Sequence, residues 1–221
     1  MAEVTVAAAT TRQLSATRSE LLARRSQIAL ANLGLDLLKE KRDALRSEFI
    51  RLSGSLLEAM GSLDERCGEG RRELSNAVAL DGPEMVGSAA FAAIAEVEVG
   101  LSARNVAGVS IVEVDKPALR RPATDRGYSL RATTARVDGV AEAFESQLDL
   151  LLDVVARELS LRRLAEAITL TTRRMNALEV VVIPRLEAER DSIELMLDER
   201  EREDRVRLMR ARQRSAMERG A

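Results

Sequence analysis

Residues 14–63 read LSATRSELLARRSQIALANLGLDLLKEKRDALRSEFIRLSGSLLEAMGSL, and this stretch decides the fold. The stretch has a seven-residue repeat in which one position is apolar in every repeat but one, where it is Arg42. The apolar residues at this position are Leu14, Leu21, Ile28, Leu35, Phe49, Leu56 and Leu63. A second position, three residues further on, begins with Thr17 and Arg24 and then carries Ala31, Leu38, Leu45, Leu52 and Ala59. Two apolar positions sustained over this many heptads predict a coiled-coil helix.

A second pattern of helical spacing follows Tyr128. Its apolar residues are separated mostly by steps of three and four and therefore share one predicted face: Val140, Phe144, Leu148, Leu151, Val155, Leu159, Leu164, Ile168, Met175, Leu178, Val182, Leu186, Ile193 and Leu197. We expect a helix from about residue 130 to residue 215. Two such helices in one chain pair side by side only if the chain turns back, so they should pack antiparallel.

The segment between the two helices is less regular. Gly68 and Gly70 predict a break in the first helix, and a turn at 81–83 precedes a short helix over 85–95. Alternating apolar residues at 97–101 and a β-branched run at 109–114 predict a β-hairpin, because a turn sequence separates them. Residues 116–127 contain two prolines and should form a connecting loop.

Together these elements predict an all-α fold, a long antiparallel two-helix coiled coil with a small middle head that contains a short helix and a β-hairpin. The predicted domains are an N-terminal helix at 8–67, a head at 68–129 and a C-terminal helix at 130–215. The composition agrees, since a charged fraction of 32% and an aromatic fraction of 2% fit neither a large globular core nor a β-rich protein.

Composition also excludes several functions. The net charge of −2 gives the chain no electrostatic attraction for nucleic acid. The chain also contains no His, which is the commonest general base and the commonest metal ligand. Cys67 is the only cysteine, so neither a disulfide nor a thiolate zinc site can form within the chain. Gly68-Glu69-Gly70 lacks the Lys of a phosphate loop. We therefore predict no catalytic, cofactor-binding or metal-binding residues and no cofactor.

No stretch approaches the roughly 18 apolar residues of a membrane span, and the N-terminus has no basic segment followed by an apolar run. These features predict a soluble, cytoplasmic protein with no direct membrane insertion.

The end of the second helix is strongly charged, with acidic residues before basic ones. Asp198 with Arg202, Glu201 with Arg205 and Glu203 with Arg207 are spaced i,i+4, which stabilises a helix without packing. The basic residues that follow lack interleaved aromatics, so protein contact is favoured over nucleic acid.

Pro184 lies inside the apolar pattern and cannot donate to the carbonyl of Val180. The second helix should therefore kink or unwind locally between Val180 and Ile183.

Three segments resemble a known family. Gly34 to Leu45 is similar to the signature G..LLK.KRD.L of the D subunits of V/A-type ATPases, and Arg173 to Pro184 resembles their RRVNALE..VIP motif. Glu199 to Leu208 resembles their EREE..RLK ending. The similarity covers nearly the whole chain, whereas Ala9-Thr10-Thr11-Arg12 departs from the usual Pro-Thr-Arg-like start.

The resemblance implies a non-catalytic central rotor shaft that couples ATP hydrolysis or synthesis to ion translocation. Its implied partners are the A and B subunits of the nucleotide-binding ring, the F subunit and the membrane-side C subunit, on the cytoplasmic face of a membrane. The expected contact residues are Arg12, Arg202, Arg205, Arg207 and Arg210. Asn176 and Pro184 are expected to have structural roles.

Two other functions remain open from the residues themselves. The heptads alone equally permit a free-standing coiled-coil adaptor, which would not co-purify with large nucleotide-binding subunits. An enzyme would rest only on the carboxylates and the basic tail, and ATP hydrolysis by the isolated chain would reveal it.

Overall fold

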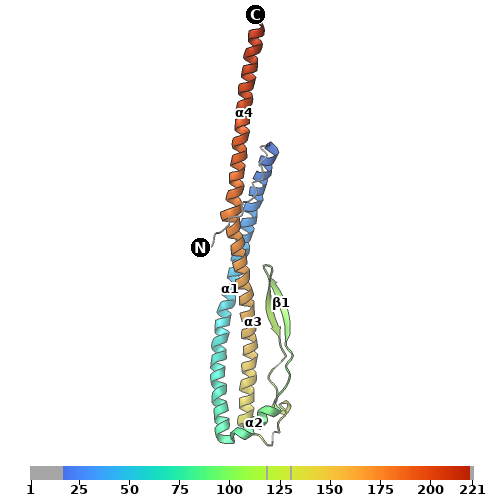
Figure 1. The fold of residues 1–221 in the computed structure, drawn as a ribbon. Helices are drawn as coiled ribbons and strands as arrows, with labels where there is room; N and C mark the ends of the chain where they lie inside the picture. The colour runs from blue at the N-terminus through green and yellow to red at the C-terminus, as the bar shows by residue number, and fades with distance from the viewer. Residues whose placement is uncertain (1–16, 118, 130, 220–221) are drawn as a thin grey trace, which may run out of the picture. The chain divides into compact units, whose positions relative to one another are not determined.

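The computed structural model describes residues 17–117, 119–129 and 131–219 and is mostly helical (Figure 1). Its elements are α1 (Arg18–Asp81), α2 (Pro83–Ala92), β1 (Gly100–Val106), β2 (Val109–Asp115), the 3₁₀-helix η1 (Ala123–Asp125), α3 (Ala135–Ala177), the π-helix η2 (Leu178–Val182) and α4 (Ile183–Arg219). The predicted long helices, short helix and hairpin are confirmed. The chain forms two compact units, unit 1 with residues 1–40 and 171–221 and unit 2 with residues 41–170.

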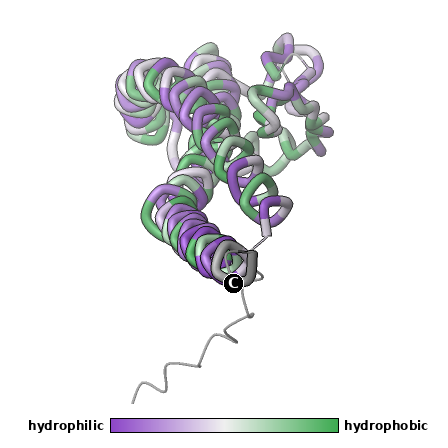
Figure 2. Tube along the Cα trace, turned by 90° about the horizontal axis from the view of Figure 1, so that it is seen from above, coloured by the Kyte–Doolittle hydropathy of each residue, from purple (hydrophilic) through white to green (hydrophobic). Residues whose placement is uncertain are grey.

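Unit 2 contains the main hydrophobic cluster. Leu45 and Leu52 of α1, Leu164 of α3 and Ile111 of β2 are buried together, and Leu45 and Leu164 have no exposed surface. The hairpin thus completes a core that two antiparallel helices alone would leave open. Elsewhere hydrophobic and hydrophilic residues alternate around the helices (Figure 2), as expected for helices that bury only one stripe.

The hairpin pairs antiparallel in a regular register from Gly100↔Asp115 to Val106↔Val109. Its turn residues Ala107 and Gly108 have φ of 50° and 82°, the positive values that a two-residue hairpin turn requires. The Asn105 side chain accepts a hydrogen bond from the Gly108 amide at 2.9 Å. Local turn chemistry therefore fixes the hairpin.

Buried Ser160 of α3 attaches the hairpin to the helices. Its hydroxyl accepts a hydrogen bond from the Val112 amide at 3.0 Å and lies 3.1 Å from the Val112 carbonyl and 2.9 Å from the Ala156 carbonyl. Arg163 also donates to the Ser110 carbonyl at 3.2 Å. Side chains of α3 therefore form hydrogen bonds with the backbone of Ser110 and Val112 on β2.

The break expected at Gly68 and Gly70 is wrong, because α1 continues to Asp81. Neither glycine has a positive φ. At Gly70 the Gln147 side chain of α3 occupies the space that a Cβ would take, and its amide donates to the Arg66 carbonyl at 2.8 Å. Gly70 therefore permits a close side-chain approach rather than a turn.

The end of α1 is fixed by polar contacts of Asp81. Arg136 forms an ion pair with it at 2.6 Å, and the Thr134 hydroxyl donates to it at 2.7 Å. Hydrogen bonds first from Arg136 and then from Thr134 lower the pKa of Asp81. Gly82 follows with φ of 85°, and Pro83 begins α2. The predicted turn at 81–83 therefore lies where the first helix actually ends.

The local unwinding predicted beside Pro184 takes the form of the π-helix. The Ile183 amide donates a hydrogen bond to the Leu178 carbonyl, five residues earlier. In an α-helix the acceptor would be the carbonyl of Glu179, four residues earlier. Pro184 directly follows the π-helix in a continuous helical backbone, so the local unwinding lies where the proline cannot donate its hydrogen bond.

In unit 1 the first part of α1 packs antiparallel against the second long helix. Ile28, Leu35 and Ile193 are buried along this contact. Ion pairs connect Arg24 with Glu189 at 2.9 Å and Arg25 with Glu194 at 2.7 Å. The predicted apolar seam is therefore confirmed here.

Candidate interaction surfaces

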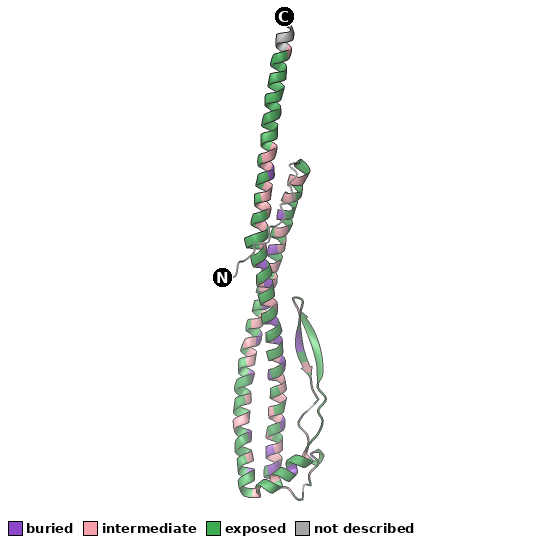
Figure 3. Cartoon of the chain, in the orientation of Figure 1, coloured by how far each residue is buried: buried purple, intermediate pink, exposed green. Residues whose placement is uncertain are grey.

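The charged end of α4, residues 198–214, is exposed at every position (Figure 3). The ion pair of Arg18 with Glu201 at 2.8 Å comes from the first residue of α1, and α4 continues to Arg219. No described residue packs against the turns that follow. This segment therefore presents a bare helix surface.

Ion pairs within α4 stabilise the charged end. Arg205 pairs with Glu201 at 3.6 Å and Arg207 with Glu203 at 3.5 Å, as the i,i+4 spacing predicts. Arg202 pairs with Glu199 at 3.7 Å instead of with the expected Asp198. Each exposed pair contributes only about 0.2–0.5 kcal/mol, so the segment is helical but weakly stabilised.

The last cations of the charged end are available to a partner. Arg210, Arg212 and Arg214 are exposed and form no ion pair with any residue in the described ranges. The expected contact residues Arg202, Arg205, Arg207 and Arg210 thus share one exposed helical segment. Arg12 lies outside the described residues. Asn176 is exposed on α3, away from this segment.

The apolar face predicted for the second helix is present between residues 144 and 159, but it is exposed instead of buried. Phe144, Leu148, Leu151, Val155 and Leu159 are each 40–44% exposed. Because a helix turns about 100° per residue, these five lie within one narrow stripe, which we call the α3 stripe.

The burial of the residues around the α3 stripe explains why the stripe itself is exposed. The buried residues of this part of α3 are Glu145, Val154, Ala156, Ser160 and Leu164. Arg157 donates to the Ser55 carbonyl of α1, whereas Ser160 contacts the hairpin. The helix α1 and the hairpin therefore cover two sides of α3, and the α3 stripe remains exposed on a third side.

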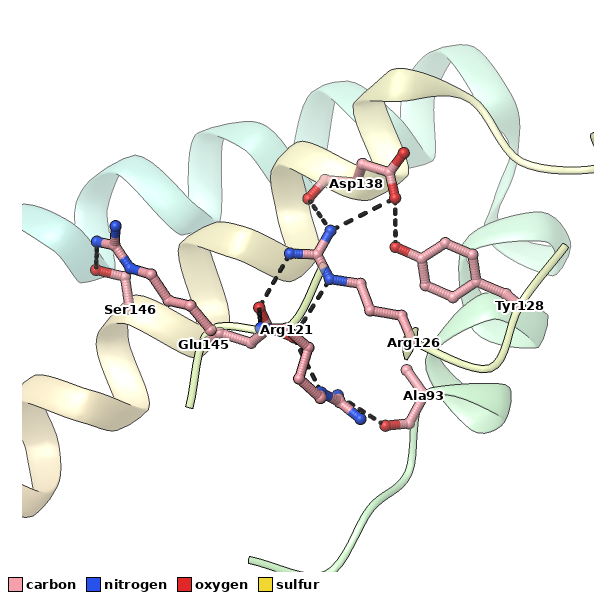
Figure 4. A network of polar contacts seen from close by, with 8 residues as sticks. Ala93, Arg121, Arg126, Tyr128, Asp138, Glu145 and Ser146 are labelled. Atoms are coloured by element: carbon pink, nitrogen blue, oxygen red, sulfur yellow. Dashed lines mark hydrogen bonds and ion pairs between the residues drawn. The ribbon is translucent and has the colours of Figure 1, made fainter. Parts of the chain in front are cut away.

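A buried ion-pair cluster attaches the loop before α3 to that helix (Figure 4). Arg126 is 5% exposed and pairs with Glu145 at 3.0 Å and with Asp138 at 3.5 Å. Arg121 contacts Glu145 at 3.3 Å and the Ala93 carbonyl at 3.1 Å. The cluster therefore connects the end of α2, the loop and α3.

Hydrogen bonding controls the charges in this cluster. Burial alone would raise the pKa of Glu145, but hydrogen bonds from Arg126 and Arg121 outweigh burial, and the pKa of Glu145 is lowered. The hydrogen bond to Glu145 raises the pKa of Arg126. Burial and the hydrogen bond to Asp138 raise the pKa of Tyr128. Glu145 is thus held ionised as an acceptor, which suits a structural role rather than proton transfer.

An apolar cavity of about 360 Å³ lies beside this cluster, between α1, α2 and α3. Its lining includes Leu74, Val86, Ala89, Val140 and Phe144. The polar groups at its margin, Arg121, Tyr128 and Glu145, already bind one another or neighbouring groups. The cavity offers apolar contact without the free polar groups that orient a substrate.

Within residues 17–117, 119–129 and 131–219, no group of three or more acidic or cysteine side chains is placed to hold a metal ion. None of the helices in those ranges combines the length and apolar character needed to cross a membrane. Cys67 is a free, half-buried thiol.

Comparison with known proteins identifies the family. Residues 20–213 match the family of ATP synthase D subunits. The D subunit of a V-type ATP synthase from Anaeromyxobacter sp. (strain Fw109-5) is 44% identical over 152 residues, which cover 69% of this chain and 71% of the relative. The D subunit of an A-type ATP synthase from Thermococcus gammatolerans is 40% identical over 150 residues, 68% of this chain and 70% of the relative.

Proposed function

Since this chain belongs to the D-subunit family of V/A-type ATP synthases, the central-stalk component of that complex, we propose that it is the rotating shaft of the enzyme. Nucleotide-driven changes in the ring of A and B subunits turn it, and it transmits this rotation to the membrane sector. In synthesis the direction of energy flow reverses. The chain itself performs no chemistry.

The observation that carries this proposal is the bare charged end of α4. A helix with exposed residues on all sides contributes nothing to a folded core, so its sequence is explained by contacts with other proteins. Its acidic residues come first along the helix, and mostly basic residues follow. A single asymmetric helix inside a ring offers a different surface to each of the ring's members, which is what directional rotation requires.

Packing in both units supports the transmission of torque. Two helices that bury a continuous seam resist relative sliding because close-packed side chains have little free space. In unit 2 the hairpin and Ser160 add a third contact to the pair. A pair stiffened in this way delivers twist instead of absorbing it.

We assign the A and B subunits to the charged end of α4 and the F and C subunits to unit 2. The α3 stripe supports the second assignment, because an apolar surface of four helical turns in water is typical of a protein-binding face. Arg202, Arg205, Arg207 and Arg210 are the proposed contacts with the ring. The complex would lie on the cytoplasmic face of the membrane.

The test is deletion of residues 198–221 in the assembled complex. ATP hydrolysis by the ring should persist while ATP-driven ion pumping is lost, because the ring no longer binds the end of the shaft. A matched control replaces Arg185, an exposed cation of α4 outside the charged end, with Gln and should pump normally. Unchanged pumping in the truncated complex would contradict the proposal.

A free-standing adaptor predicts a different result. Such a protein would purify without nucleotide-binding subunits, and its deletion from the cell would leave ATP-driven pumping intact. Affinity purification of the full chain, followed by identification of stoichiometric partners, separates the two functions.

A further inference from the structure

The helix α1 has a regular seam in unit 1. Its residues that face the second long helix are buried or half-buried and follow an unbroken heptad pattern: Leu21, Arg24, Ile28, Ala31, Leu35 and Leu38. Steps of three and four residues alternate through this series, as in a regular coiled-coil helix. The heptads of α1 therefore contain no additional residue here.

The second long helix has the same pattern on each side of the π-helix, but its two parts are out of step by one residue. Before the π-helix, buried Thr171 and half-buried Leu178 lie seven residues apart. After it, half-buried Leu186 and buried Ile193 also lie seven residues apart. From Leu178 to Leu186 the separation is eight residues. The second helix thus contains one residue more than the heptad pattern needs.

The other seam position of this helix shows the same shift. Met175 is buried, and an unbroken pattern would place Val182 next along the seam. Val182 is instead exposed, whereas Ile183 is half-buried. Arg190 and Leu197 follow Ile183 at intervals of seven residues and are also half-buried. Both seam positions therefore shift by one residue at the π-helix.

A regular α-helix would not keep both parts of this seam on one side. Five residues of α-helix turn by about 500°, so Ile183 would lie about 140° around the helix from Leu178. In the π-helix the Ile183 amide donates to the Leu178 carbonyl, and one turn holds an additional residue. This wider turn returns Ile183 to the side of the helix on which Leu178 lies.

We propose that the π-helix is a phase-correcting device, which absorbs one additional residue so that the second long helix presents its seam to α1 on both sides of the π turn. None of the five residues of the π-helix is buried, so the packing that selects the π turn lies on either side of it. Because α4 is one continuous helix, the same turn sets the direction of every later side chain, including those of the charged end. This inference does not depend on the proposed function.

Pro184 alone does not account for the change of phase. A proline removes one hydrogen bond and bends a helix, but it adds no residue to a turn. The ion pairs that depend on the phase lie beyond it, since Arg24 pairs with Glu189 at 2.9 Å and Arg25 with Glu194 at 2.7 Å. A shift by one residue would turn both glutamates by about 100° and separate both pairs.

The experiment deletes one residue from either helix of the pair in the full chain. All variants carry Pro184→Ala, because a proline inside a regular α-helix would destabilise that helix by itself. The test variant lacks Val181 of the π-helix, which is 61% exposed. The matched control lacks Leu33 of α1, which is 58% exposed and belongs to the unbroken heptads. Hydrogen exchange measured by mass spectrometry reports the protection of the amides of residues 21–38 and 186–197.

Deletion of Val181 should convert the π turn into α-helix with the seam in phase, because Ile183 would then follow Leu178 by four positions. Exchange in both segments should stay within about threefold of the Pro184→Ala chain or become slower. Deletion of Leu33 turns either Ile28 or Leu35 away from the seam. Exchange should then become at least about tenfold faster, because exposing one buried aliphatic side chain accounts for that factor. Equal acceleration by the two deletions, or acceleration by neither, would overturn the proposal.

A second measurement does not depend on the deletions. The crystal structure of Pro184→Ala should retain the hydrogen bond from the Ile183 amide to the Leu178 carbonyl, because the additional residue is still present. A hydrogen bond from Ile183 to the Glu179 carbonyl in that structure would show that Pro184 causes the π turn, and the proposal would be wrong. Retention of the π turn in Pro184→Ala, together with tolerance of the Val181 deletion, supports it.

Discussion

The core of unit 2 and the charged end of α4 are both built from long helices, yet they are stabilised in opposite ways. In unit 2 Leu45 and Leu164 have no exposed surface, and a hairpin covers the helix pair. At the end of α4 every residue from 198 to 214 is exposed, and ion pairs within the helix replace packing. The difference separates the part that maintains the fold from the part that is free for contact.

The largest effect should come from Leu164→Ala in unit 2. Removing a fully buried leucine loses its transfer free energy and leaves a cavity, so the free energy of unfolding should fall by about 3–5 kcal/mol. Urea denaturation followed by circular dichroism measures this change. The control is Leu208→Ala in the charged end, which should change stability by less than about 0.5 kcal/mol because Leu208 is exposed. Similar losses in both variants would contradict the distinction between the two regions.

Glu145→Gln should have the next largest effect, because Arg126 would remain buried without its charged partner. The loss should be about 2–4 kcal/mol at pH 7. Glu142→Gln on the exposed side of α3 is the control and should be nearly neutral.

The pH dependence follows from the lowered pKa of Glu145. Its folded-state pKa lies below the unfolded value of about 4.3, so its stabilisation is complete above that value and is lost as pH falls through the folded pKa. The stability difference between the original chain and Glu145→Gln should therefore begin to shrink as the pH falls below the unfolded value of about 4.3 and should vanish only below the folded-state pKa. A constant difference down to pH 2 would show that Glu145 does not act through its charge.

Two glycines of α1 should respond with opposite signs. Gly70→Ala places a methyl group on the Gln147 side chain and should destabilise unit 2 by about 1–2 kcal/mol. Gly61→Ala meets no atom within 4 Å and should stabilise the helix by about 0.5–1 kcal/mol, because alanine loses less backbone entropy. Thermal unfolding measures both. Stabilisation by Gly70→Ala would mean that the close approach of Gln147 is easily relieved.

The smallest effect on stability should come from deleting residues 198–221. The urea midpoint should remain unchanged, because these residues bury nothing in the described structure, while total helicity falls in proportion to the residues removed. A lowered midpoint would show that the charged end supports the fold as well as its contacts.

The sequence alone determined the helices, their antiparallel pairing and the hairpin. Heptads such as those carrying Leu35 and Leu45 leave one apolar stripe per helix, which only another helix with a matching stripe can cover. The hairpin turn at Ala107 and Gly108 follows from backbone preferences of a few residues. The charged end was also predictable, because i,i+4 pairs depend only on spacing along one helix.

The tertiary structure alone decided what each apolar residue faces. The stripe from Phe144 to Leu159 has ideal spacing for a seam, yet α1 and the hairpin occupy the other two sides of α3 and leave it exposed. Gly70 likewise lies inside α1, and the Gln147 side chain occupies the space beside it, a contact that no local pattern reveals. Spacing fixes which residues share a helix face, but burial depends on neighbours that are distant in sequence, and only the folded chain brings those together.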